Sequence, residues 1–175
     1  MAKWQSGGVA GWIGGLAMMA AVCVVGMVAG AQTPLWQDGK PAAKAEAVKY
    51  LYPEQVTLQA GKATAVQLHF RIAPGLHINS HAPKEQFLIP TTFSVPEGTG
   101  VKLESAAYPE GHPYTLPADP DTKLDVFSGE FAIEARLTAS PGDHLVEAKL
   151  RYQACDETQC MPPKTITVAI DVVGR

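Results

Sequence analysis

The sequence has few cysteines, no excess of basic residues and no convincing amphipathic helix, and these shortages narrow the choice of fold and function. Lysine and arginine total 14 against 17 aspartates and glutamates. The chain therefore has no positive field that would hold a polyanion, and we expect no nucleic-acid partner. No nucleophilic triad, phosphate-binding glycine loop or pair of catalytic carboxylates has a recognisable spacing. The three cysteines, at positions 23, 155 and 160, carry the most informative chemistry.

The N-terminus has the features of an export signal. Lys3 supplies a positive start, residues 9–28 are apolar and rich in small side chains, and residues 29–31 form an A-x-A cleavage site. We expect residues 1–31 to be a signal peptide that is removed, so that the mature chain begins at Gln32 in the periplasm. Six glycines dilute the apolar run, and a retained membrane anchor is the less favoured alternative. Cys23 is then discarded with the signal.

The mature chain of 144 residues has the size of one domain. Residues 32–47 are rich in alanine, lysine and proline without a sustained apolar period, which is typical of a flexible tether. We expect the folded domain to cover residues 48–175. An oxidising compartment favours a disulfide between the two cysteines that remain, Cys155 and Cys160.

Strict alternation of apolar and polar residues predicts β-strands with one face in a core. It occurs around residues 66–72, 131–137, 146–152 and 166–172, with shorter candidates at 76–80, 92–95 and 101–106. About seven or eight strands at these spacings indicate an all-β sandwich. Four prolines in Tyr108–Leu124 exclude a continuous central strand, so this stretch is expected to be a long surface loop.

The two cysteines lie near the ends of a short acidic connection between two predicted strands, as in a hairpin. Across such a hairpin the two Cα atoms can fall within the 4.4 to 6.8 Å that a disulfide requires. Cys155 continues the alternation of Arg151 and Gln153, which places it opposite the apolar face and toward the surface. A near-surface disulfide of this kind is open to attack by an incoming thiolate.

Two other interpretations of the cysteine pair stay open. A structural disulfide is one, although closing a loop of about six residues removes only about 2 kcal/mol of unfolded-chain entropy. A metal site is the other, because His77 and His81 form an H-x3-H pair that would join the cysteines as four ligands. Nothing in the pattern brings residues 76–80 to the cysteine hairpin. We therefore expect neither a metal nor another cofactor.

The residues around the cysteines resemble the N-terminal domain family of the bacterial thiol:disulfide interchange protein DsbD. The resemblance rests on the pattern Y-Q-x-C followed by C-x-P-P, at residues 152–155 and 160–163. Supporting matches lie at residues 75–80, 87–92 and 126–130. It implies an immunoglobulin-like β-sandwich whose cysteine pair, here Cys155 and Cys160, cycles between dithiol and disulfide.

The resemblance also implies roles for neighbouring residues and a set of partners. Asp125–Gly129 is similar to the family's cap loop, which would make Phe127 the lid, Asp125 a nearby acid and the strands adjoining Tyr152 the wall. Family members continue into a membrane domain and a thioredoxin-like domain, whereas this chain ends at Arg175. We therefore expect a separate membrane electron carrier and thioredoxin-like periplasmic proteins as partners. The alternative is a non-catalytic sandwich that binds a protein or a metal.

Overall fold

A computed structural model describes residues 46–51, 55–117 and 119–175. The expected signal peptide, and the expected tether as far as residue 45, lie outside these described residues. Ala47, assigned to the tether, is buried with the core residues, and the first strand begins at Val48. In the described part of the chain, no helix is long and apolar enough to cross a membrane.

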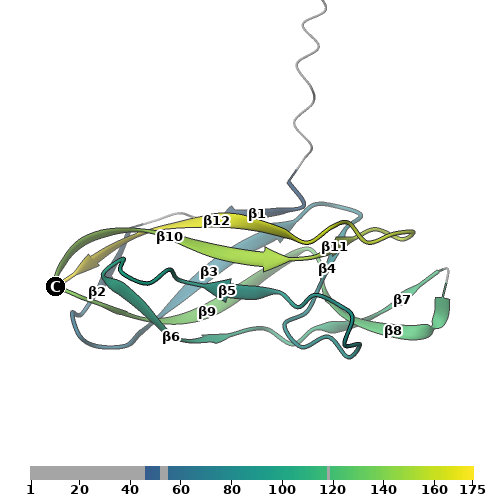
Figure 1. The fold of residues 1–175 in the computed structure, drawn as a ribbon, viewed down its shortest axis with the longest axis horizontal. Coiled ribbons are helices and arrows are strands. Elements are labelled where there is room, and N and C mark those ends of the chain that lie inside the picture. Colours follow the sequence, from purple (N-terminus) through teal and green to yellow (C-terminus); the bar gives the residue numbers. More distant parts are fainter. Residues whose placement is uncertain (1–45, 52–54, 118) are drawn as a thin grey trace, which may run out of the picture. The chain divides into compact units, whose positions relative to one another are not determined.

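Twelve strands form three four-stranded sheets in the described residues (Figure 1). In chain order they are β1 (Val48–Leu51), β2 (Gln55–Leu58), β3 (Thr64–Ile72), β4 (His77–Asn79), β5 (Thr92–Ser94), β6 (Val101–Ala107), β7 (His112–Leu116), β8 (Asp119–Phe127), β9 (Glu130–Ala139), β10 (Gly142–Tyr152), β11 (Ala154–Cys155) and β12 (Lys164–Gly174). The sheet orders are β1-β3-β9-β6, β2-β12-β10-β5 and β11-β4-β8-β7. The expected all-β, immunoglobulin-like sandwich is confirmed, with more strands than the seven or eight predicted.

The core of the sandwich lies between the first two sheets and is built by the predicted alternation. Beyond the first residues of β3, β9, β10 and β12, every second residue is buried, and those between them face outward or are half-buried. Phe70 of β3 and Phe131 of β9 are directly opposed and stack with ring centroids 5.2 Å apart. These residues bury large apolar side chains from both sheets, and the same core reaches the cysteine end, where Ile78 and Ala154 belong to it.

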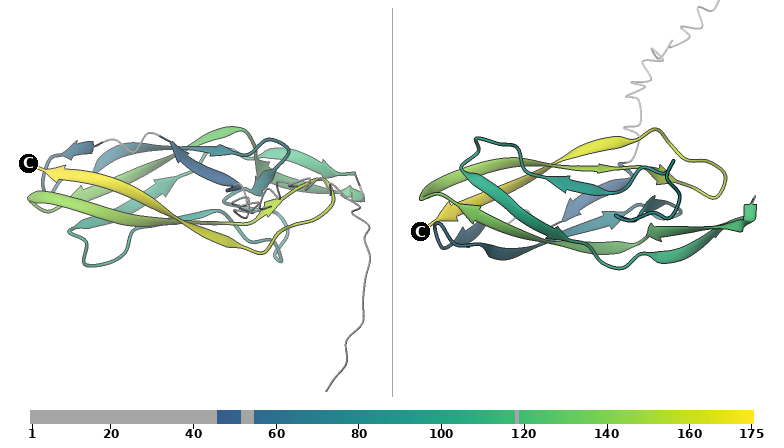
Figure 2. Two further views of the ribbon diagram at one scale, coloured as in Figure 1. Left: turned by 90° about the horizontal axis from the view of Figure 1, so that it is seen from above. Right: turned by 60° about the horizontal axis from the view of Figure 1, so that its bottom comes forward.

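The third sheet extends the sandwich at the end remote from the C-terminus (Figure 2). It is joined to both main sheets, because β8 runs into β9 and β10 runs into β11. The β8–β9 turn consists of Ser128 and Gly129, and Gly129 has φ of 66°, a conformation that favours glycine. The carbonyl of Gly129 accepts a hydrogen bond from the amide of Ile72, which fixes the turn to β3.

The expectation of a long surface loop at Tyr108–Leu124 is wrong. This stretch contains β7 and most of β8, which pair antiparallel from His112↔Val126 to Leu116↔Asp119. β7 is an edge strand and has no neighbouring strand on its outer side. Pro113, which lacks a backbone amide, is tolerated there because no strand on that side needs its hydrogen bond. Pro120 falls within the irregularity between the Thr115 and Leu116 pairings, where no regular ladder exists.

Candidate functional site

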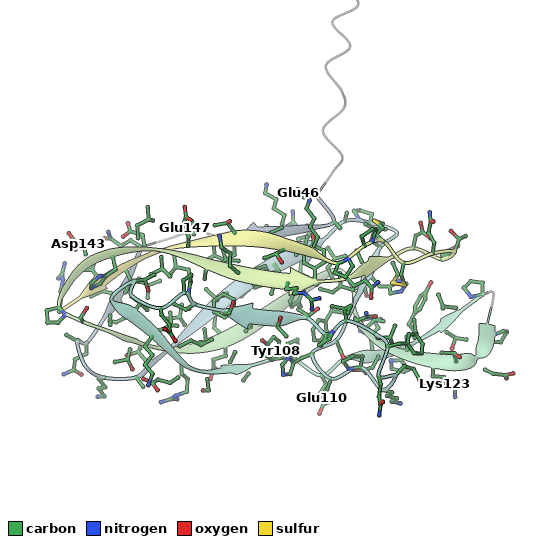
Figure 3. The ribbon with its side chains drawn as sticks, viewed as in Figure 1. Glu46, Tyr108, Glu110, Lys123, Asp143 and Glu147 are labelled. Atoms are coloured by element: carbon green, nitrogen blue, oxygen red, sulfur yellow. A yellow bond between two sulfur atoms is a disulfide. The ribbon has the colours of Figure 1, made fainter. Side chains whose placement is uncertain are left out.

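Cys155 and Cys160 form a disulfide across a tight hairpin at the third sheet (Figure 3). The two residues face each other as an antiparallel bridge, and their Cα atoms lie 3.9 Å apart, closer than the expected range. Two backbone hydrogen bonds close the hairpin, from the Asp156 amide to the Gln159 carbonyl and from the Met161 amide to the Ala154 carbonyl. The loop therefore keeps both sulfurs on one short, hydrogen-bonded segment.

The two cysteines differ sharply in their access to solvent. Cys155 is completely buried, at 0% exposure, whereas Cys160 is exposed. The prediction that Cys155 lies toward the surface is wrong, because the strand does not continue through Gln153. β10 ends at Tyr152, and the chain enters a different sheet as β11, so the alternation of β10 no longer applies. Of the two cysteines, only Cys160 is open to solvent.

His77 lies directly opposite Cys155, which the sequence did not predict. β4 pairs antiparallel with β11, with Cys155↔His77 and Ala154↔Ile78 in register. The His77 side chain is buried, at 4% exposure, and its ring packs at a tilt against Tyr114 of β7 with centroids 4.2 Å apart. Burial lowers the pKa of His77, and the nearby Asp156 carboxylate opposes that shift. The imidazole beside the cysteines is therefore biased toward its neutral form.

The second histidine of the H-x3-H pair does not join the cysteines. His81 stacks on Tyr108 with ring centroids 3.8 Å apart, and its Nδ1 lies 2.9 Å from the carbonyl oxygen of Thr91. Within the residues that the structure describes, no group of three or more histidine, cysteine, aspartate or glutamate side chains is arranged to hold a metal ion. The four-ligand arrangement is thus not formed.

Asp156 orders the loop between the cysteines. Its Oδ1 accepts hydrogen bonds from the Thr158 amide at 2.7 Å, the Thr158 hydroxyl at 2.7 Å and the Gln159 amide at 2.8 Å. These bonds to the charged form lower the pKa of Asp156. The carboxylate therefore stays ionised in the mildly acidic range and holds the loop that carries Cys160.

Gln153 ties the cysteine hairpin to its surroundings, a role that sequence reasoning missed. Its Nε2 donates to the Met161 carbonyl at 3.2 Å, just beyond Cys160. Its Oε1 accepts from Asn79 Nδ2 at 3.3 Å and from the Ile89 amide at 3.4 Å. One amide side chain thus links the hairpin, β4 and the segment before β5. In the sequence, this role is indicated by the place of Gln153 in the Y-Q-x-C pattern.

The residues expected to form the cap and wall lie at different depths. Phe127 is buried at 3% exposure in the main core, pairs with Ile78 of β4, and stacks on Phe131 with centroids 5.1 Å apart. Asp125 is half-buried, and its backbone carbonyl accepts a hydrogen bond from the Ser80 amide. Tyr152 is buried at the end of β10, and burial raises its pKa. The lid role of Phe127 stays a prediction.

The β7–β8 hairpin supplies a second aromatic near the cysteines. Tyr114 is half-buried, packs with the small cluster of Leu88, Leu124 and Val126, and contacts His77. Tyr114 and Leu116 alternate with polar residues in the sequence, as do Leu124 and Val126, so the signal for a two-stranded hairpin was present. Tyr114 thus lies on the cysteine face of the third sheet, whereas Phe127 lies on the core face.

A comparison against protein families places the chain in a known family. Residues 47–172 match the family described as "Thiol:disulfide interchange protein DsbD, N-terminal". The chain belongs to this family. A solved structure of the DsbD N-terminal domain from Neisseria meningitidis, in the reduced form, is similar at 19% identity with a TM-score of 0.42. The similarity covers 62% of this chain and 77% of that one. A comparison with curated proteins gave no match.

Membership of the DsbD N-terminal family gives the disulfide a functional context. The predicted resemblance is confirmed over nearly the whole of the expected domain. In coarse terms, the chain is a thiol–disulfide exchange domain of a family that is periplasmic.

Proposed function

We propose that this chain relays electron pairs in the periplasm through reversible opening of the Cys155–Cys160 disulfide. The observation that carries the proposal is the contrast between an exposed Cys160 and a fully buried Cys155. A purely structural bridge needs no such asymmetry. An exchange site gains from it, because one sulfur is open to attack and the other is kept from stray thiols.

The direction of attack follows from this asymmetry. A thiolate of a reduced partner attacks Cys160 Sγ, the Cys155–Cys160 bond breaks, and Cys155 Sγ leaves with the bonding electron pair. The second thiolate of the partner then attacks the partner's own sulfur in the mixed disulfide and releases Cys160. The partner becomes oxidised to a disulfide, two electrons enter the pair, and two protons from the surroundings complete the dithiol. Reversal of these steps reduces a downstream disulfide.

The partners are proposed by their chemistry. A separate membrane electron carrier is the expected source of electrons, and thioredoxin-like periplasmic proteins are the expected acceptors. Both present a cysteine pair that can form a mixed disulfide with an exposed sulfur such as that of Cys160.

Access to the disulfide is proposed to depend on the surrounding side chains. Tyr114 is placed on the cysteine face and is the side chain we expect to restrict approach to the sulfurs. Phe127 and Tyr152 support the strands from the core side, and the Asp125 carbonyl holds the Ser80 amide just after β4. A cover that a partner displaces delays unwanted exchange until that partner is bound.

Single-cysteine variants test the proposed site. In Cys155→Ala the exposed Cys160 thiol should react rapidly with an aromatic disulfide reagent and form a stable mixed disulfide. In the matched variant Cys160→Ala the buried Cys155 thiol should react at least about tenfold more slowly at the same pH. Circular dichroism of the unmutated protein with and without dithiothreitol provides the second readout. Loss of the β signal on reduction, or equal reactivity of the two thiols, would indicate a structural disulfide instead.

A further inference from the structure

His77 is a buried ionisable side chain that the exchange steps above leave unused. Its Nε2 is shielded from solvent and has no hydrogen-bond partner among the described residues. A buried polar atom without a partner is uncommon in folded proteins and calls for a specific explanation. The oxidised state of the cysteine pair supplies one here.

The strand register places the His77 side chain on the same face of the sheet as the side chain of the buried cysteine. His77 and Cys155 are directly opposed in the antiparallel pairing of β4 with β11. Side chains of directly opposed residues lie on the same face of a sheet, with Cβ atoms about 4.5 to 5.5 Å apart. In the disulfide, Cys155 Sγ carries no proton and has nothing to donate. In the dithiol, the same sulfur carries an S–H group, and a neutral imidazole nitrogen is a suitable acceptor.

We propose that His77 accepts the proton of the Cys155 thiol when Cys155 attacks, and returns it when Cys155 leaves. This inference rests on the proposed function and adds a residue to it. The base operates after Cys160 has formed a mixed disulfide with an oxidised partner. The Cys155 proton passes to His77, Cys155 Sγ attacks Cys160 Sγ, and the partner sulfur departs as a thiolate with the electron pair. The partner is reduced, the pair is oxidised, and His77 then releases its proton to solvent.

The surroundings of His77 favour the neutral imidazole, which is the form that can accept a proton. Burial lowers the pKa of His77, His112 of β7 adds to that shift, and Asp156, which directly follows β11, opposes it. Tyr114 packs at a tilt against the ring, and β8 presents the apolar Leu124 and Val126 to this face. The imidazole is therefore neutral and able to accept a proton near pH 7, whereas a cysteine thiol there is mostly protonated. A thiolate formed beside an imidazolium is stabilised by the opposite charge.

The test measures closure of the disulfide in the reduced protein. Reduced protein is mixed with oxidised glutathione, quenched with acid, and analysed by mass spectrometry for dithiol, glutathionylated and disulfide forms between pH 5.5 and 8.5. In the unmutated protein the glutathionylated form should close quickly. In His77→Gln it should accumulate, with closure slowed about 100-fold at pH 7 and accelerating with each pH unit as the thiol ionises. His81→Gln, which removes an imidazole outside the cysteine face, serves as the matched control and should close at the normal rate.

The outcomes separate this inference from the proposed function. If His77→Gln closes with the rate and pH profile of the unmutated protein, His77 is not the proton acceptor, although the exchange function stands. If the unmutated folded protein does not exchange with glutathione at all, the proposed function fails. A second measurement needs no variant. Nitrogen NMR of the His77 ring should show a different Nε2 environment and a different pKa in the oxidised and reduced protein. Identical titrations in both states would overturn the proposal.

Discussion

Truncation of Tyr114 and truncation of Phe127 should have opposite effects on stability and on the reactivity of the disulfide. Phe127 is the end of a row of three stacked rings, with centroid separations of 5.1 Å to Phe131 and then 5.2 Å to Phe70. Truncation of a buried phenylalanine to alanine costs about 3 to 5 kcal/mol. With a urea dependence of about 2 kcal/mol per molar for a domain of this size, Phe127→Ala should lower the urea midpoint by roughly 2 M. Its fold should persist in the absence of denaturant.

Tyr114→Ala should behave in the reverse manner. Tyr114 is half-buried on an edge strand, so the main loss is its ring contact with His77, and aromatic pairs contribute about 0.5 to 1.5 kcal/mol. The urea midpoint should fall by less than about 1 M. The rate at which dithiothreitol reduces the Cys155–Cys160 disulfide should rise severalfold, because a cover over the cysteine face is removed.

The assay is the pseudo-first-order rate of disulfide reduction, measured on both variants under conditions where each is fully folded. Stability is measured on the same preparations by urea denaturation. The reasoning is refuted if Phe127→Ala accelerates reduction while retaining a normal urea midpoint. That result would make Phe127 the lid, as the family resemblance implies, and would leave Tyr114 as an ordinary hairpin residue.

Two further predictions concern the polar groups around the hairpin. Gln153→Ala removes bonds to Asn79, Ile89 and Met161, and it should lower the free energy of unfolding by about 1 to 3 kcal/mol. An unchanged urea midpoint in Gln153→Ala would show that these hydrogen bonds do not stabilise the fold. Because burial lowers the folded-state pKa of His77, the unfolded chain binds a proton there that the folded chain does not. The free energy of unfolding should thus fall by up to about 1.4 kcal/mol per pH unit below about pH 6.5, until the folded pKa is reached. Urea midpoints at pH 7.5 and 5.5 should show a smaller loss in His77→Gln than in the unmutated protein, and parallel losses would contradict the assignment.

The main sandwich was predictable because local alternation and burial agree along its long strands. Val66, Leu68, Phe70 and Ile72 are buried in β3 as their spacing predicted, and β12 repeats the pattern. The proline rule failed at Pro113 because it applies to central strands, and nothing local in the sequence marks β7 as an edge.

The cysteine site was harder to predict because it depends on contacts between distant segments. The cysteine pair and its disulfide followed from spacing and compartment. The depth of Cys155 did not, because the alternation of β10 ends where the chain leaves for another sheet at Gln153. The opposition of His77 and Cys155 joins residues far apart in sequence, and it is fixed only by the pairing of β4 with β11. Alternation assigns a residue to a face but does not reveal which strand lies beside it.

The division of the strands among three sheets has a consequence for local stability. β11 has two residues and β4 has three, whereas β3, β9, β10 and β12 are nine to eleven residues long and supply most of the main core, to which β4 and β11 add only Ile78 and Ala154. Short strands with few ladder bonds belong to the segments that open at low free energy without global unfolding. Amide hydrogens of the cysteine end are therefore expected to exchange through sub-global opening, while those of the long strands exchange only through complete unfolding. If the disulfide cycles as we propose, the segment that carries Cys155 can loosen during exchange while the long strands retain their structure.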